Sequence, residues 1–328
     1  PPHRTLDVHL DFGRLTLQFS GDDFEIEDER NWTEMGYKVY AGPFERGWPL
    51  VLPPGGKVEQ SVEISLEPTA RTNSTFQSEH THPTVTVDAE RVWNLPHIGH
   101  QATVLGRELD QLEARLLASL RPDFIHVEFR ERDPDRLEKL NEGLSQAVSV
   151  GASVSVALFV SADVGSLLAE LDDAVHKRGV LLVSLLLYVD GGDAEDTERW
   201  GTPPELTASA MATIRSRFGS VRVFVGSDLN LAEFNRRPPA LNGADGFCIG
   251  MSPSGHADES WAIMANLPAQ GDALRTLKAF EPTALLCAGP ISLQIPEGGG
   301  PRPPDATPWP PNVDPRQTSS LAASWTLG

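Results

Sequence analysis

The stretch PDFIHVEFRERDPDRLEKLNEGLSQAVSVGASVSVALFV (residues 122–160) decides the fold. It contains two runs, 124–129 and 154–160, that are apolar at nearly every position, joined by a segment with apolar residues such as Leu140 and Leu144 at helical spacing. Such runs are typical of strands buried on both faces, as in a parallel sheet covered by helices. The stretch therefore predicts a strand–helix–strand unit.

The same alternation extends to the end of the chain at intervals of about 25–40 residues, as βαβ units require. The predicted strands are residues 96–99, 124–129, 154–160, 180–189, 221–226, 246–251 and 284–291. The pattern predicts an α/β fold, a (β/α)8 TIM barrel of seven strands plus a truncated last unit. We expect the eighth strand to lie beyond Gly328, where the sequence stops within a helical pattern. A Rossmann-like open sheet is disfavoured because its G-x-G-x-x-G turn is missing after the first strand.

Residues 1–90 have a different pattern. Apolar and polar residues alternate at 5–10, 15–19 and 58–66, which indicates strands with one solvent-facing side. We expect a partial antiparallel β-sandwich whose first strands precede Pro1. The predicted domains are thus residues 1–90, β-rich and incomplete, and residues 91–328, the truncated barrel.

Composition excludes several classes of partner. The net charge of −19 opposes binding to nucleic acid or to an anionic membrane, and no apolar run is long enough to span a bilayer. Cys248 and Cys287 are too few for a disulfide framework, so we expect a reducing, cytoplasmic location. We expect no cofactor and no metal, because P-loop and C-x-x-C motifs are absent and His80 and His82 lack a third ligand nearby.

A barrel carries its chemistry at the carboxyl ends of its strands and in the loops just beyond. The polar residues at those positions include carboxylates and imidazoles, which are the groups that general acid–base catalysis uses. They are His97, His100, Glu128, Arg130, Tyr188, Asp190, Asp228, Asn230, His256, Asp258, Ser292 and Gln294. Any one of them alone is more often structural or solvated, but together they predict an active site at one rim.

The densest polar cluster, FEIEDERNWT (24–33), lies outside the predicted barrel. It is too charged for a core strand and too aromatic for an ordinary solvated loop. Two interpretations stay open. Arg30 and neighbouring carboxylates close a turn while Trp32 packs at a domain interface, or the cluster acts directly at the mouth of the barrel.

This cluster carries a resemblance to a known family. The sequence EDERNWT (27–33), followed by YKVY (37–40), resembles the E-D-[QH]-R-N-W-T-D-A-S-[FY]-K-x-Y segment of bacterial D-apionate lactonases. Further stretches resemble N-F-T-E-L-N-R-x-R-P, N-P-Q-V-H-A, V-D-P-R-Q and A-A-W-T-L-G of that family, in the same order. They are NLAEFNRRP (230–238), SPSGHA (252–257), VDPRQ (313–317) and ASWTLG (323–328).

The resemblance implies a hydrolase that opens D-apionolactone, or a similar sugar-acid lactone, in apiose catabolism. Its fold would be a β-sandwich joined to a barrel, with a further β region after it, and its partner a small carbohydrate-derived substrate. Lactone opening needs a base that activates water, a group that stabilises the oxyanion, and a proton for the ring alkoxide.

We assign hypothetical roles on this basis. His256 or Asp228 is the base, Asn235 and Arg236 polarise the carbonyl, and Glu128 and Asp190 bind sugar hydroxyls as part of the catalytic set. The substrate-binding set also contains Glu233, Trp32 and a buttress of the mouth formed by Glu27, Arg30 and Asn31.

Two alternative functions stay open. A glycoside hydrolase is favoured if an eighth strand supplies a glutamate facing Glu128 or Asp190. A catalytically inert carbohydrate-binding barrel is favoured by departures from the family pattern, such as E-M-G at 34–36 in place of D-A-S.

Overall fold

The chain divides into two compact units, Pro1–Asp28 with Gly36–Leu95 and Glu29–Met35 with Pro96–Gly328. The computed structural model describes residues 3–32, 38–42, 51–69, 95–161, 163–190, 200–252, 260–292 and 325. Several sequence candidates lie outside the described residues, namely His80, His82, His256, Asp258 and Gln294.

The first unit contains antiparallel sheets, as predicted. One has the strand order β1-β2-β5, and the other pairs β3 with β4. The register places Leu17 directly between Leu6 and Ile64, so one face of the larger sheet is apolar. The strands are β1 (Thr5–Leu10), β2 (Gly13–Ser20), β3 (Phe24–Ile26), β4 (Val39–Ala41) and β5 (Ser61–Pro68).

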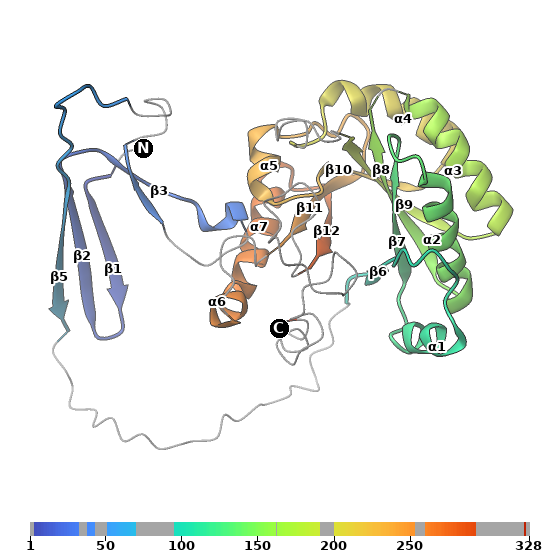
Figure 1. Cartoon of the computed structure of the whole chain (residues 1–328), viewed down its shortest axis with the longest axis horizontal. Coiled ribbons are helices and arrows are strands. Elements are labelled where there is room, and N and C mark those ends of the chain that lie inside the picture. Colours follow the sequence, from blue (N-terminus) through green and yellow to red (C-terminus); the bar gives the residue numbers. More distant parts are fainter. Residues whose placement is uncertain are drawn as a thin grey trace, which may run out of the picture. The chain divides into compact units, whose positions relative to one another are not determined.

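The second unit is a nearly closed barrel of seven parallel strands that alternate with helices, in the order β12-β11-β10-β9-β8-β7-β6 (Figure 1). The strands are β6 (Gly99–Gln101), β7 (Phe124–Arg130), β8 (Ser153–Val160), β9 (Leu182–Val189), β10 (Arg222–Ser227), β11 (Gly246–Met251) and β12 (Leu285–Ile291). The predicted TIM-barrel fold is therefore confirmed.

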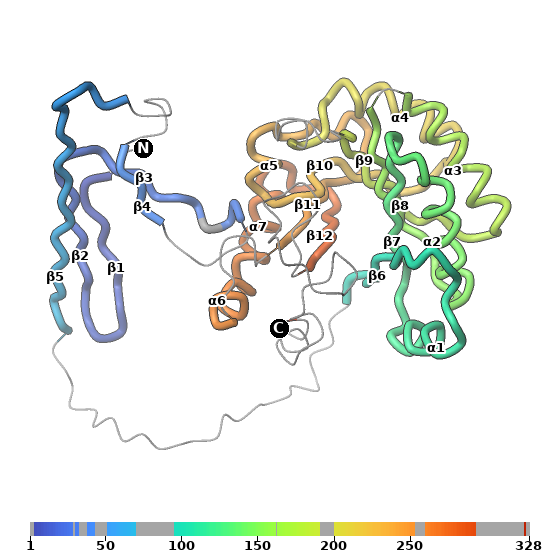
Figure 2. The backbone as a smooth tube through the Cα atoms, viewed as in Figure 1, coloured from blue at the N-terminus to red at the C-terminus, as the bar shows by residue number. Residues whose placement is uncertain are grey.

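Helices cover the outside of the barrel. Figure 1 shows α2, α3 and α4 side by side there, and Figure 2 shows the chain passing from strand to helix and back. The helices are α1 (Gln111–Ser119), α2 (Arg136–Val150), α3 (Val164–Arg178), α4 (Pro204–Phe218), α5 (Leu231–Arg236), α6 (Ser260–Ala265) and α7 (Leu267–Phe280), with the 3-10 turn η1 (Glu29–Trp32). Within the described ranges, no helix is long and apolar enough to cross a membrane.

The first barrel strand begins later than predicted. It was expected at 96–99, but pairing with β7 begins only at Gly99. His97 therefore lies before the strand, at the amino-terminal edge of the sheet, where its Nδ1 is 3.7 Å from Asp123 Oδ1. The prediction that His97 follows this strand is wrong. Pro96 has no N–H for a sheet hydrogen bond, so the strand does not begin there.

The core lies between the sheet and its helices. Ile125, Val127 and Phe129 of β7 alternate with partly exposed residues and are at most 3% exposed, in one cluster with Leu140 and Leu144 of α2. Burying side chains of this size contributes about 1.5–3 kcal/mol each. The intervening residues of β7 face the interior of the barrel, because successive side chains of a strand point to opposite faces.

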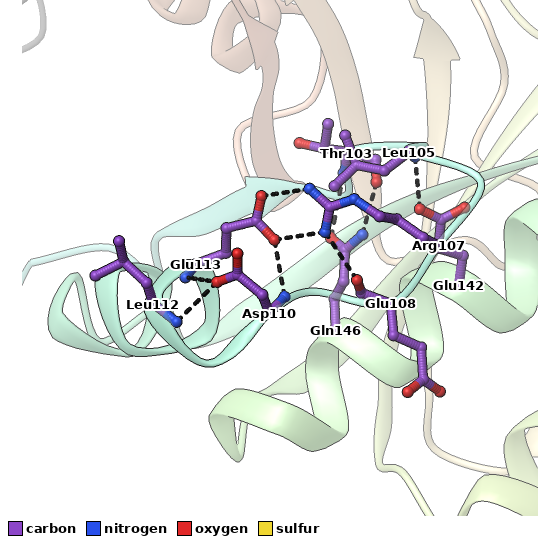
Figure 3. A network of polar contacts seen from close by, with 9 residues as sticks. All are labelled: Thr103, Leu105, Arg107, Glu108, Asp110, Leu112, Glu113, Glu142 and Gln146. Atoms are coloured by element: carbon purple, nitrogen blue, oxygen red, sulfur yellow. Dashed lines mark hydrogen bonds and ion pairs between the residues drawn. The ribbon is translucent and has the colours of Figure 1, made fainter.

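Polar contacts fix the loop between β6 and α1 onto α2 (Figure 3). Gln146 Nε2 donates to the carbonyl oxygen of Thr103 at 2.6 Å, and Gln146 Oε1 accepts from the N–H of the same residue at 3.2 Å. The carboxylate of Glu142 accepts from the N–H groups of Leu105 and Gly106 at 2.5 and 3.2 Å. These contacts satisfy backbone groups of the loop that neither helix nor sheet pairs.

The same loop ends in the cap of α1 (Figure 3). Asp110 accepts from the N–H groups of Leu112 and Glu113, while Glu113 accepts from the N–H of Asp110. Arg107 donates to both carboxylate oxygens of Glu113 at 2.6 and 2.7 Å. Together with the hydrogen bond from Asp110, the guanidinium lowers the pKa of Glu113 to about 2. The loop and the helix start therefore form one hydrogen-bonded unit.

Replacing Gln146 with leucine should lower the free energy of unfolding by about 1–3 kcal/mol, because the N–H and C=O of Thr103 lose their partners beside a side chain that is only 4% exposed. Urea denaturation measures the change. Gln111→Leu at the exposed start of α1 is the matched control and should stay within about 0.5 kcal/mol of wild type. Equal stabilities of the two variants would contradict a structural role for Gln146.

Candidate active site

A cavity of about 530 Å³ opens at the carboxyl ends of the barrel strands, where the sequence predicted the site. Because the strands are parallel, these ends share one rim. The lining combines charged side chains of both signs with one aromatic ring. The residues are Arg132, Ser161, Val189, Asp190, Trp200, Pro203, Arg236 and Arg237.

Asp190 is the buried carboxylate of this cavity. It directly follows β9, and its N–H continues the ladder by bonding the carbonyl oxygen of Val160 at 2.8 Å. Its side chain is 4% exposed, and Oδ2 accepts from the N–H of Arg132 at 2.9 Å. The carboxylate is thus held in one orientation, and none of the described residues donates a hydrogen bond to Oδ1.

A layer of larger side chains lies beneath the cavity. The register aligns Arg130 of β7 with Phe159 of β8, and Phe159 with Tyr188 of β9. Asp190, which lines the cavity, comes two residues after Tyr188 and continues the ladder of β9, so the two side chains point to the same face. The layer of Arg130, Phe159 and Tyr188 therefore lies one step deeper in the barrel than Asp190. We call this layer the floor, although none of its residues is among the described lining residues.

Glu128 and Arg130 form an ion pair in this floor. Arg130 donates from Nε and Nη2 to Glu128 Oε2 at 3.0 and 2.8 Å. Gln101 of β6 donates to Glu128 Oε1 at 3.2 Å. The guanidinium carbon of Arg130 lies 3.5 Å from the centroid of the Phe159 ring. The strongest contacts of Glu128 are therefore with a neighbouring cation, whereas the sequence suggested a role in binding sugar hydroxyls.

The charge balance of the floor keeps Arg130 protonated and Tyr188 neutral. Burial lowers the pKa of Arg130, but Glu128, Asp228 and Asp190 together outweigh it and raise the pKa. Burial, with Cys248 as a neighbour, raises the pKa of the Tyr188 hydroxyl well above its usual value. Asp228 follows β10 and is 6% exposed, so three carboxylates act on one guanidinium.

Helix α5 positions Arg236. Asn230 precedes the helix, and its N–H donates to Glu233 Oε2 at 3.2 Å, while its Oδ1 accepts from the N–H of Ser252 at 3.2 Å. Glu233 Oε1 accepts from Arg236 Nη1 at 3.0 Å. Glu233 is 4% exposed, and burial raises the pKa of its carboxyl group. Glu233 therefore orients Arg236 toward the cavity, although it is not among the described lining residues.

Two tryptophan rings flank the guanidinium of Arg236. Its Cζ lies 5.5 Å from the ring centroid of Trp32 and 6.0 Å from that of Trp200, within the range of cation–π attraction. Arg237 braces the segment before α4, because its Nε donates to the carbonyl oxygen of Gly201 at 2.7 Å and its Nη2 to that of Trp200 at 3.3 Å. Arg236 thus lies near both rings, and Arg237 fixes the backbone that carries Trp200.

The polar cluster at 24–33 divides between the two units. Glu27 belongs to the first unit, where Tyr40 donates to it at 3.0 Å and Lys38 pairs with it at 3.7 Å. The turn η1 groups with the barrel instead. There Arg30 Nη1 donates to Thr276 Oγ1 at 2.8 Å, and Asn31 Oδ1 accepts from Asn235 at 3.3 Å.

The sequence candidates are thus distributed unevenly. Asp190 and Arg236 line the cavity, and Glu128 lies in its floor. The exposed side chain of Asn235 contacts η1 and is not among the described lining residues. Sequence reasoning missed the lining residues Arg132, Trp200 and Arg237. The roles assigned to all these residues stay predictions.

Arg132, Trp200 and Arg237 had no signal in the strand pattern, because all three lie outside the strands, Arg132 in the turn that follows β7. Among the described residues, no group of three or more His, Cys, Asp or Glu side chains could hold a metal ion.

Comparison with known families agrees with this architecture. The model of the D-apionate lactonase TIM barrel domain matches residues 98–328, and that of the D-apionate lactonase N-terminal domain matches residues 4–69. This chain belongs to the D-apionate lactonase family. The resemblance carried by the sequence motifs is therefore confirmed.

A relative of low sequence identity is also a D-apionate lactonase. The chain is 22% identical over 268 residues to the D-apionate lactonase of Brucella anthropi, an alignment that covers 80% of this chain and 43% of the relative. The chain thus spans less than half of the length of that relative.

Glu233→Gln should make this lactonase-family chain at least as stable as wild type at pH 8, because the substitution removes a buried charge and keeps an acceptor for the N–H of Asn230. A carboxyl group whose pKa is raised by folding contributes stability at low pH and loses it as pH rises through the raised pKa. The advantage of the variant should therefore shrink as pH falls from 8 toward 5.5. Thermal unfolding across this range measures it.

Glu138→Gln, at an exposed position of α2, is the control for the removal of a single carboxylate. The prediction is contradicted if Glu233→Gln is less stable than wild type at pH 8 and more stable than wild type at pH 5.5.

Proposed function

We propose that this chain binds a carbohydrate-derived lactone in the rim cavity and opens its ester bond with water. Family membership supports the substrate class, a sugar-acid lactone, with D-apionolactone as the first candidate. The observation that carries the proposal is that a buried carboxylate, Asp190, and a positioned guanidinium, Arg236, share one cavity of about 530 Å³. Small-molecule sites are typically about 300–1,000 Å³ in volume.

The cavity residues supply complementary contacts. Asp190 accepts hydrogen bonds from substrate hydroxyls, and the ring of Trp200 packs against the C–H face of the sugar. Arg236 donates to the substrate's ester oxygens. The general base is His256 or Asp228, as inferred from the sequence. A cytoplasmic role in apiose catabolism is part of the same proposal.

The reaction divides into attack and ring opening. The base takes a proton from water as the water oxygen bonds to the carbonyl carbon, and the carbonyl oxygen becomes an oxyanion. The ring C–O bond then breaks, the ring oxygen takes up the proton, and a hydroxy acid leaves. Groups that bind the oxyanion more strongly than the neutral carbonyl accelerate this sequence.

The direct test is the release of acid from a panel of aldono-1,4-lactones that includes D-apionolactone, with and without a chelator. We expect this chain to hydrolyse at least one of them, with the rate unaffected by the chelator. Because the chain spans only 43% of the Brucella anthropi relative, a form extended to that length is assayed in parallel. If neither form hydrolyses any lactone of the panel, the proposal is contradicted, and glycosidic substrates or carbohydrate binding alone are favoured.

Arg236→Met should lower kcat/KM by about 10²-fold, the order of magnitude found when one charged donor to a reacting oxygen is removed. Arg178→Met, at the exposed end of α3, is the matched control and should retain wild-type kcat/KM. If both variants have the same kcat/KM, Arg236 does not contribute to catalysis.

A further inference from the structure

Arg130 has one nitrogen, Nη1, that has no hydrogen-bond partner among the described residues. Nε and Nη2 both donate to Glu128 Oε2, whereas Nη1 makes no hydrogen bond with any described residue. The side chain is 31% exposed, although it belongs to the layer beneath the cavity. A guanidinium has five N–H donors in a fixed plane, so the two that remain on Nη1 have a fixed direction.

The orientation of this guanidinium is determined by its neighbours. Glu128 holds two nitrogens on one edge, Gln101 holds the other oxygen of Glu128, and the Phe159 ring covers one face at 3.5 Å. An ion pair that is half removed from water contributes little net stability. Two hydrogen bonds and a stacked ring fix both the position and the plane of the guanidinium. An ammonium group has no plane to be fixed, so these contacts are specific to arginine.

Arg130 also lies close to the cavity. Its layer is one step deeper in the barrel than Asp190, which lines the cavity. Asp190 and Asp228 interact electrostatically with Arg130, so the cation lies among the acidic groups of the rim.

We propose that Arg130 is a catalytic residue that stabilises the oxyanion at the lactone carbonyl, and that Glu128 and Phe159 are its positioning residues. This inference rests on the proposed lactone hydrolysis. As water adds to the carbonyl carbon, the electron pair of the C=O bond moves to oxygen, and Nη1 donates to that oxygen. Arg130 stays protonated throughout, and the proton lost by water returns to the departing ring oxygen.

Arg130→Met should lower kcat by about 10²–10³-fold while KM changes only a few-fold, because the contact is strongest in the transition state. Arg130→Lys keeps the charge but not the fork, and should still lose at least about tenfold in kcat. The matched control is Arg136→Met, since Arg136 forms a comparable pair with Glu170, at 2.9 Å for both hydrogen bonds. It should retain wild-type kcat.

Chemical rescue separates a catalytic from a structural role. Added guanidinium should restore part of the kcat of Arg130→Ala, whereas wild type and Arg136→Ala should gain nothing. If the wild-type protein hydrolyses a lactone and Arg130→Lys has the same kcat, this inference is overturned, but the proposed function is not. Lack of rescue in a folded Arg130→Ala, checked by circular dichroism, would also overturn it. No turnover by wild type on any lactone would instead overturn the proposed function, and this inference with it.

Discussion

The parallel register of β7, β8 and β9 is the constraint on which the candidate site depends. It aligns Arg130, Phe159 and Tyr188, which are far apart in sequence, in one layer of the barrel interior. Because side chains alternate along a strand, Glu128 two residues earlier faces the same way as Arg130 and can pair with it. A shift of the register by one residue would turn these groups toward the helices and bring Phe129 into the barrel. The apolar core and the polar rim are therefore fixed by the same hydrogen-bond ladder.

The family motif at residues 27–32 is divided by this architecture. Glu27 pairs with Lys38 and Tyr40 in the first unit, whereas Asn31 and Trp32 contact α5 of the barrel. One short motif thus serves two structural purposes, which explains why it is both charged and aromatic. Arg30 donates to a threonine of the barrel, and the Trp32 ring lies near the guanidinium of Arg236, which lines the cavity. Both interpretations of the cluster stay predictions.

The barrel was predictable from sequence because its strands are buried on both faces and leave an apolar run at each position. Where burial is weak, the prediction failed, as at β6, whose three residues are all partly or fully exposed. From the strand pattern alone, the polar residues of the rim were predictable only where they continue a strand, as Asp190 does. Arg236, which lies in α5, was named from the family motif instead. Trp200 and Arg237 come from loops, whose paths depend on contacts such as that between Arg237 and the carbonyl oxygen of Gly201. Sequence periodicity contains no information on such contacts.

The charge distribution connects the site with the whole chain. A chain with a net charge of −19 nevertheless brings Arg130, Arg132, Arg236 and Arg237 to one rim. In the proposed reaction, lactone opening converts a neutral substrate into an anion, so these arginines would favour the oxyanion and would also retain the product. The acidic surface opposes this retention only over short distances, because at physiological salt the Debye length is about 8 Å. Asp190 lines the cavity, and Asp228 and Asp190 both interact with Arg130. The positive charge of the arginines is therefore offset in part by carboxylates on the same side of the barrel.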